Sequence, residues 1–201
     1  MIPSFIRTNP RLAWYAFLAI AASGFGQTFF VSVMGEELRH AFSLSHAAYG
    51  SLYSGATVLS AVFLFRLGGL ADKWPLPRVT TLAVFALGAG CLCIALAPSG
   101  IFLVPGFFLI RFGGQGYMGH LGITTAARYF PSHRGSAVAM AAFGFPLAEA
   151  VLPAGAALFI AGMGLEIGLT ALLAGTAVVV LGASFLAGMA AFGRMQRPPA
   201  K

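Results

Sequence analysis

The residues best suited to chemistry are two ionisable side chains that interrupt long apolar runs. Arg111 lies about ten residues into one run and Glu149 about thirteen residues into the next. At about 1.5 Å per residue both lie roughly 15–20 Å along a helix, near the middle of a membrane span. A guanidinium there offers forked donors to a carboxylate or phosphate. We therefore expect Arg111 and Glu149 to bind an anion and carry a proton, or to form a static ion pair with each other.

Three more polar side chains lie within apolar runs. Gln115 follows Arg111 by four residues and so shares its helix face, whereas His120 lies on the opposite side of that helix. His120 is expected to hydrogen-bond a neighbouring helix or to contact substrate, and Gln27 to contact substrate or to pack between helices. A stripe at helical spacing is expected to pack against another helix, with substrate contact as the alternative: Tyr49, Tyr53, Thr57 and Ser60.

The composition indicates a protein whose solvent is lipid. Of the 201 residues 59% are hydrophobic and 8% are charged, whereas soluble domains carry about 25% charged residues. The net charge of +7 is typical of nucleic-acid binders, but the bases lie in short loops between apolar runs, which excludes that class. Cys91 and Cys93 point to opposite sides of one helix, so neither a mutual disulfide nor a metal site is expected.

Six apolar runs are long enough to span a membrane, which takes about 20 residues. They cover 12–34, 47–67, 79–97, 101–127, 136–161 and 167–192, between an N-terminal segment 1–11 and a tail 193–201. The run 12–34 exceeds the roughly 7–15 apolar residues of a signal peptide, which predicts an uncleaved helix. Threading six helices places nine of the twelve bases on one side, so both termini are predicted to be cytoplasmic.

The predicted helices differ in polarity. The third and sixth contain no ionisable side chain except the two thiols, so they can face lipid. The first, fourth and fifth carry the polar residues named above and should face an interior, because a charge in hydrocarbon costs several kcal/mol.

The loop after the second predicted helix is short and charged. Gly68, Leu70, Ala71, Asp72 and Lys73 match the signature G-x-L-A-D-[RK]-x-G-[RK]-[RK] that joins the second and third helices of the major facilitator superfamily. Pro75 replaces its glycine, and Arg78 restores a base downstream of the motif. The resemblance implies that Asp72 helps to lock a cytoplasmic gate. Its available base partners are Lys73, Arg78, Arg128 and Arg134.

Two further segments resemble the same superfamily. The segment 111–116 is similar to its fourth-helix motif R-x-x-Q-G, with one extra residue between Arg111 and Gln115. The segment 144–146 resembles the fifth-helix motif of its antiporters, and the loop 128–135 its fourth-to-fifth connection. No rhomboid-protease, aquaporin, P-loop or metalloprotease motif is present in the sequence.

The resemblance implies an all-α membrane protein with six transmembrane helices, the N-terminal half of a major-facilitator fold built from a 3+3 inverted repeat. The expected function is secondary active transport of a small organic solute in the bacterial inner membrane, and Arg111 and Glu149 favour an organic anion and proton coupling. The expected partners are lipid, substrate, protons and a second copy or a separate C-terminal half; no cofactor, metal or enzyme activity is expected. The alternative is a non-transporting assembly protein or an inactive half-transporter.

Overall fold

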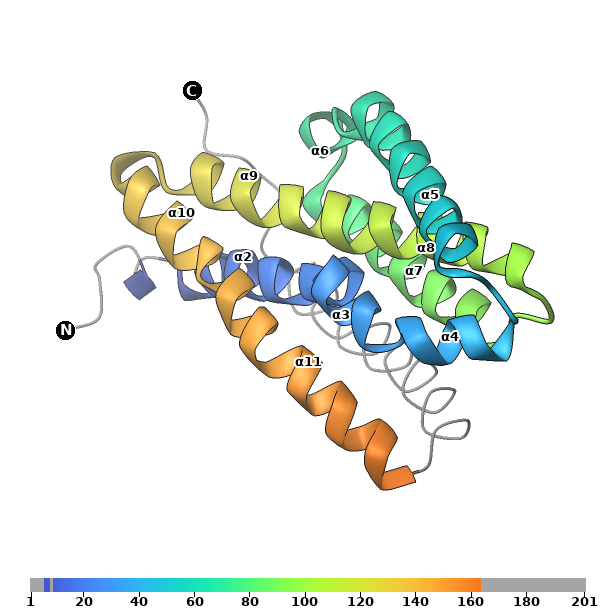
Figure 1. The fold of residues 1–201 in the computed structure, drawn as a ribbon. Coiled ribbons are helices and arrows are strands. Elements are labelled where there is room, and N and C mark those ends of the chain that lie inside the picture. Colours follow the sequence, from blue (N-terminus) through green and yellow to red (C-terminus); the bar gives the residue numbers. More distant parts are fainter. Residues whose placement is uncertain (1–5, 8, 164–201) are drawn as a thin grey trace.

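The computed structural model describes residues 6–7 and 9–163, and within them every regular element is a helix. The sixth predicted span, 167–192, and the tail 193–201 lie outside the described residues. Figure 1 shows a central layer that contains α2, α7, α8 and α9, with α5 and α11 diverging from it in different directions.

The first predicted span is discontinuous in the structure. Asn9 caps α2 (Pro10–Ser23) by accepting a hydrogen bond from the Leu12 backbone nitrogen at 3.3 Å. A short 3-10 turn, η1 (Gly24–Gly26), follows, and Gln27 then adopts an extended conformation with ψ of 157° before α3 (Thr28–Val33). The polar patch beyond it is also helical, as α4 (Gly35–Ala41).

The next two spans are unbroken helices joined by the signature loop. Ser45 caps α5 (His46–Leu67), which ends at Gly68. A single turn, α6 (Leu70–Lys73), lies in the loop, and α7 (Leu76–Ala95) begins directly after Pro75. Proline suits the start of a helix because its missing N–H would have no partner there.

The fourth span changes its helix type in the middle. The 3-10 turn η2 (Gly100–Phe102) leads into α8 (Leu103–Ile110), the π-helix η3 (Arg111–Met118) and α9 (Gly119–Tyr129), which run on without a gap. The turn η4 (Pro131–His133) then leads to α10 (Arg134–Ala142) and α11 (Gly144–Met163).

Four helical segments in the described part are long and apolar enough to cross a membrane. They are Pro10–Val33, His46–Lys73, Leu76–Ala95 and Pro131–Gly162. The fourth span is not among them, because η3 and α9 carry arginine, glutamine, histidine and several glycines. That helix nevertheless lies at the centre of the bundle, where it packs against α2, α5 and α7.

The core lies where the fourth span meets its neighbours. Leu87 of α7, Phe107 of α8 and Tyr117 of η3 are completely buried there. α7 and η3 approach so closely that a Cβ on Gly113 would lie 2.4 Å from the Ala83 carbonyl oxygen. Small residues allow this contact between helix backbones, which is the usual way to pack helices in lipid.

Candidate functional site

The guanidinium of Arg111 connects the fourth span to the break in the first. Arg111 is 6% exposed, and its Nη1 donates to the carbonyl oxygen of Gly26 at 3.2 Å and to Oγ1 of Thr28 at 3.3 Å. Because Gln27 is extended, the regular helical ladder stops at this point, so the Gly26 carbonyl is available to an outside donor. The helix break therefore creates an acceptor, and Arg111 supplies the donor.

Two glycines bring these backbones together. A Cβ on Gly26 would lie 2.3 Å from the Ile110 carbonyl oxygen, and a Cβ on Gly114 would lie 2.7 Å from the Gly26 Cα. Real Cβ atoms do not approach backbone this closely, so any larger residue would push η1 away from η3. The Arg111 contacts depend on that distance.

The third element of the site is α5, through Tyr53. The Arg111 Cζ atom lies 5.2 Å from the centroid of the Tyr53 ring, which is a cation–π contact. The Tyr53 hydroxyl is 3.0 Å from Thr28 Oγ1, and its ring packs edge-on against Phe107. Arg111, Thr28 and Tyr53 thus form one polar cluster, which we call the arginine cluster, at the meeting of η3, α3 and α5.

Arg111 keeps unused hydrogen-bonding capacity. Its Nε atom is buried and has no hydrogen-bond partner among the described residues. Nη2 likewise forms no bond with the part of the chain that the structure describes. These atoms make up one edge of the guanidinium, which is the edge that can hold both oxygens of a carboxylate.

The structure separates the other predicted site residues. No ion pair joins Arg111 to Glu149 in the described part of the chain, so the static pair, one of the two alternatives for these residues, does not form in this structure. Glu149 is exposed on α11, and Gln115 and His120 are exposed on the fourth span. Gln27 contributes its backbone conformation to the break and is itself half-buried.

Thr28 is a functional candidate that the sequence did not single out. Tyr53 belongs to the polar stripe on the second helix, for which packing against another helix was expected and substrate contact was the alternative. The glycines on either side of Phe25, next to a glutamine, were the available signal for a helix break near Thr28. Neither pattern identifies which residue of another helix makes the contact.

A second charged group lies in the signature loop. Asp72 of α6 forms an ion pair with Nη2 of Arg128 in α9, and Nη1 of the same arginine lies 3.4 Å from the Ala71 carbonyl oxygen. Among the four bases proposed as partners, Arg128 is thus the one that the structure selects. Arg134 instead donates from Nε to the Ala127 carbonyl oxygen at 3.1 Å.

The rest of the signature loop is arranged around this ion pair. Gly68 ends α5, and Leu70 begins α6. The buried Tyr117 of η3 donates its hydroxyl to the Leu67 carbonyl oxygen, which fixes the loop to the fourth span. Lys73 and Arg78 form no ion pair with any residue that the structure describes.

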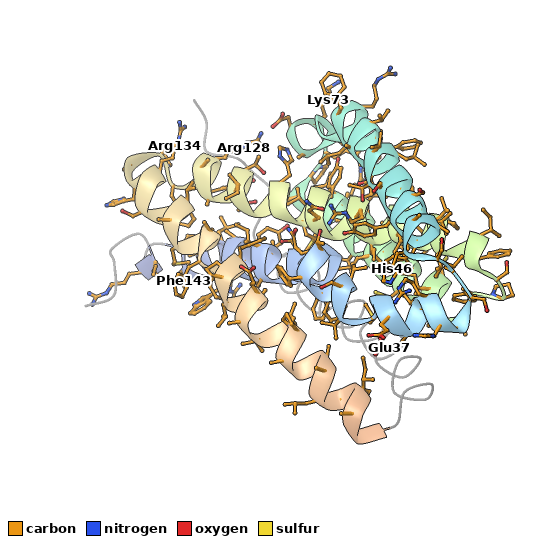
Figure 2. The ribbon with its side chains drawn as sticks, in the orientation of Figure 1. Glu37, His46, Lys73, Arg128, Arg134 and Phe143 are labelled. Carbon is orange, nitrogen blue, oxygen red and sulfur yellow. The ribbon has the colours of Figure 1, made fainter. Side chains whose placement is uncertain are left out.

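The two ends of the bundle carry different charges. Figure 2 shows Lys73, Arg128 and Arg134 toward one end and Glu37 and His46 toward the other. At the basic end a cleft of about 430 Å³ opens between the segment 71–78 and α9. Asp72 and Arg128 both line it.

Comparison with known proteins identifies the family. The sequence profile described as Major Facilitator Superfamily matches residues 16–201. No curated protein and no solved structure matches the chain. The profile spans nearly the whole chain, and four described helical segments are apolar enough to cross a membrane. The chain therefore belongs to the major facilitator superfamily and is a multi-pass membrane transport protein.

Proposed function

We propose that this chain carries out secondary active transport of a small organic anion by alternating access, with Arg111 as the residue that binds the anion. The observation that carries the proposal is a guanidinium that is 6% exposed, touches neutral groups, and has a buried Nε without a partner in the described part of the chain. A charge so placed in a membrane protein is costly and is usually functional.

The partners of Arg111 support an anionic substrate. A buried arginine with a structural role is normally neutralised by a carboxylate, because an uncompensated buried charge costs several kcal/mol. Here a carbonyl, a hydroxyl and an aromatic ring solvate the cation without cancelling it. A carboxylate substrate would supply the missing charge and the missing acceptors together.

Proton coupling is proposed for Glu149. Its side chain is exposed on α11, and no base pairs with it among the described residues. α11 carries Pro153 inside the helix, and a proline permits bending during a conformational change. Gln115, Gln27 and His120 are secondary candidates for contact with substrate, since each is exposed or half-buried in this structure.

Alternating access requires a second wall across the arginine cluster. Most residues of two described segments are not covered by the rest of the chain. In the apolar stretch of His46–Lys73, which contains α5, 17% of the residues are buried, and in that of Pro131–Gly162 22% are, compared with 56% in α7. We propose that a second six-helix half, or a second copy of this chain, covers these two helices, and that the basic end faces the cytoplasm of a bacterial cell.

Transport by purified protein in lipid vesicles tests the proposal. A panel of radiolabelled mono- and dicarboxylates is offered with and without an imposed proton gradient. We expect gradient-driven uptake that Arg111→Ala abolishes and Arg111→Lys lowers strongly, because lysine cannot hold a carboxylate with two parallel bonds. Arg66→Gln is the matched control, since Arg66 lies near the end of α5 and has no contact in the arginine cluster. Uptake that survives Arg111→Ala unchanged would falsify this role.

A further inference from the structure

The cleft at the basic end is separate from the arginine cluster and is not used by the transport proposal. One wall is the turn 71–78, which contains α6 and the start of α7. The other wall is formed by α9 side chains: Leu121, Thr124, Thr125, Arg128 and Tyr129. With a volume of about 430 Å³ the cleft is large enough for a small ligand.

The charges around the cleft are unbalanced. Three bases and one acid line it, and the acid, Asp72, is paired with Arg128. Lys73 and Arg78 remain exposed, and neither forms an ion pair or a side-chain hydrogen bond with a described residue. The cleft therefore carries two uncompensated positive charges on one wall.

Helix α7 adds a third positive contribution. It begins at Leu76 in the cleft wall, no side chain caps it, and its first turn holds no acid. The N-terminus of a 20-residue helix carries a partial positive charge and is a common place for phosphate groups to bind. Pro77 has no N–H, and the Arg78 and Val79 N–H groups already donate to the Pro75 carbonyl oxygen at 2.9 and 3.4 Å, so this end contributes its helix dipole rather than a set of free donors.

An unpartnered hydroxyl lies on the opposite wall. Thr125 is 2% exposed and lines the cleft, and its side chain forms no hydrogen bond with any described residue. A threonine hydroxyl that faces a cleft can donate one hydrogen bond to a ligand there. Thr125 is therefore placed to donate to an anion held by the bases opposite it.

We propose that this cleft binds the phosphate group of an anionic phospholipid headgroup. A phosphate oxygen can accept from Lys73, Arg78 and Thr125 and can lie at the start of α7. We infer a lipid phosphate rather than a soluble one because part of the cleft is apolar. This part includes Leu76, Leu121 and Trp74, whose side chain is 47% exposed. Tryptophan is typical of the membrane interface, and basic pockets between membrane helices recognise anionic headgroups.

Trp74 provides the measurement, because the chain has two tryptophans and Trp14 can be replaced by phenylalanine. Purified Trp14→Phe protein is placed in phosphatidylcholine vesicles that contain equal fractions of brominated phosphatidylglycerol or brominated phosphatidylcholine. We expect stronger quenching of Trp74 by the brominated anionic lipid. Lys73→Gln and Arg78→Gln should each lower the preference about fivefold, since one base near an anionic surface contributes about 1 kcal/mol.

Controls separate this site from general attraction to an anionic surface. Arg66→Gln removes a base outside the cleft and should keep the preference. Thr125→Val keeps the charge of the cleft and the shape of the side chain but removes the hydroxyl, so it should lower the preference for the anionic lipid. This variant tests the site if the Lys73 and Arg78 variants do not fold. Equal quenching by the two lipids, or a preference that survives Lys73→Gln with Arg78→Gln, overturns the proposal. Inorganic phosphate is also added, with sodium chloride of equal ionic strength as its control. If phosphate abolishes the preference and sodium chloride does not, the cleft binds soluble phosphate and the proposal of a lipid ligand is overturned.

Discussion

Arg111 keeps its positive charge although it is buried. Two hydrogen bonds to neutral oxygens and one aromatic face hold it in place. Hydrogen bonds to a charged group contribute about 1.5–3 kcal/mol each, against a desolvation cost of several kcal/mol. The cation is thus positioned by the protein but not neutralised by any described carboxylate, which leaves the site attractive to an anion.

Replacement of Tyr53 separates the two contacts that this residue makes in the arginine cluster. Tyr53→Phe keeps the ring over Arg111 and loses the hydroxyl contact with Thr28, which should cost about 0.5–1.5 kcal/mol. Tyr53→Leu also loses the cation–π contact, which is worth about 2 kcal/mol when desolvated. Thermal unfolding of the purified protein in detergent should therefore show a larger loss for leucine. Equal losses would mean that the ring does not stabilise the guanidinium.

Both side chains of the Asp72–Arg128 ion pair are exposed to solvent, so the pair contributes at most about 1 kcal/mol to stability. We expect Asp72→Asn to leave the unfolding midpoint nearly unchanged but to loosen α6 from α9. The readout is the rate at which a thiol reagent labels Ala71→Cys, because Ala71 is buried beside the ion pair. Labelling should become several-fold faster, whereas the buried Ala137→Cys in α10 should be unaffected. An unchanged rate at position 71 would show that this ion pair does not close the cleft.

At the scale of elements, two irregular segments meet at the site. The break at Gln27 frees a carbonyl, and the π-helix η3 presents Arg111 to it. A π-helix closes each hydrogen-bonded ring with one residue more than an α-helix, and such segments are frequent at functional sites. The segment from Arg111 to Gln115, which has one residue more than R-x-x-Q-G, lies within η3.

The crossing of η1 and η3 should be sensitive to a single methyl group. Gly26→Ala places a Cβ 2.3 Å from a backbone oxygen, so the helices must separate, at a cost of about 1–3 kcal/mol or more. Gly55→Ala is the matched control, because a Cβ there meets nothing within 4 Å and alanine favours the helix by up to about 1 kcal/mol. Thermal unfolding should show a lower midpoint for position 26 and an equal or higher one for position 55. The opposite order would contradict the close crossing.

The sequence predicts the regular elements well and the irregular ones poorly. Length and hydropathy suffice for α5 and α7, since each is a continuous apolar helix that ends at glycine, proline or a polar turn. They do not predict the break at Gln27, because glycine and glutamine are also tolerated inside membrane helices. At the break η3 lies directly against Gly26, and this contact is tertiary, so the sequence of the first span alone does not contain it.

The same distinction applies to the site. The cost of a charge in lipid predicts that Arg111 needs partners, and the structure supplies them. Which partners it takes depends on how three helices pack, so the proposed pairing with Glu149 could not be tested from spacing within either helix. For Asp72 the sequence was more informative. The signature loop restricts its partners to a few nearby bases, and in the structure Arg128 forms the ion pair.

At the scale of the whole molecule, the least apolar of the membrane spans that the structure describes occupies the centre of the bundle. The helix from α8 to α9 extends over about 40 Å at 1.5 Å per residue, which exceeds a hydrocarbon core of about 30 Å. Its polar middle is tolerated because Arg111, Phe112, Gly113 and Gly114 are buried against other helices rather than exposed to lipid. The hydropathy of the described helices omits this one, although its run 101–127 is predicted to span the membrane and it lies at the centre of the bundle.

Thiol labelling from the two sides of the membrane tests that crossing and the orientation together. Cys91 and Cys93, both free thiols, are first replaced by alanine. Single cysteines are then introduced at Ser99 and Ser132, which are exposed beyond the two ends of the helix from α8 to α9.

If the helix spans the membrane with its basic end inside, as the excess of bases there predicts, an impermeant reagent labels position 99 in intact cells. Position 132 should react only after permeabilisation. Labelling of both positions from outside would contradict the crossing, and the reverse pattern would invert the orientation and place the lipid-binding cleft on the outer leaflet.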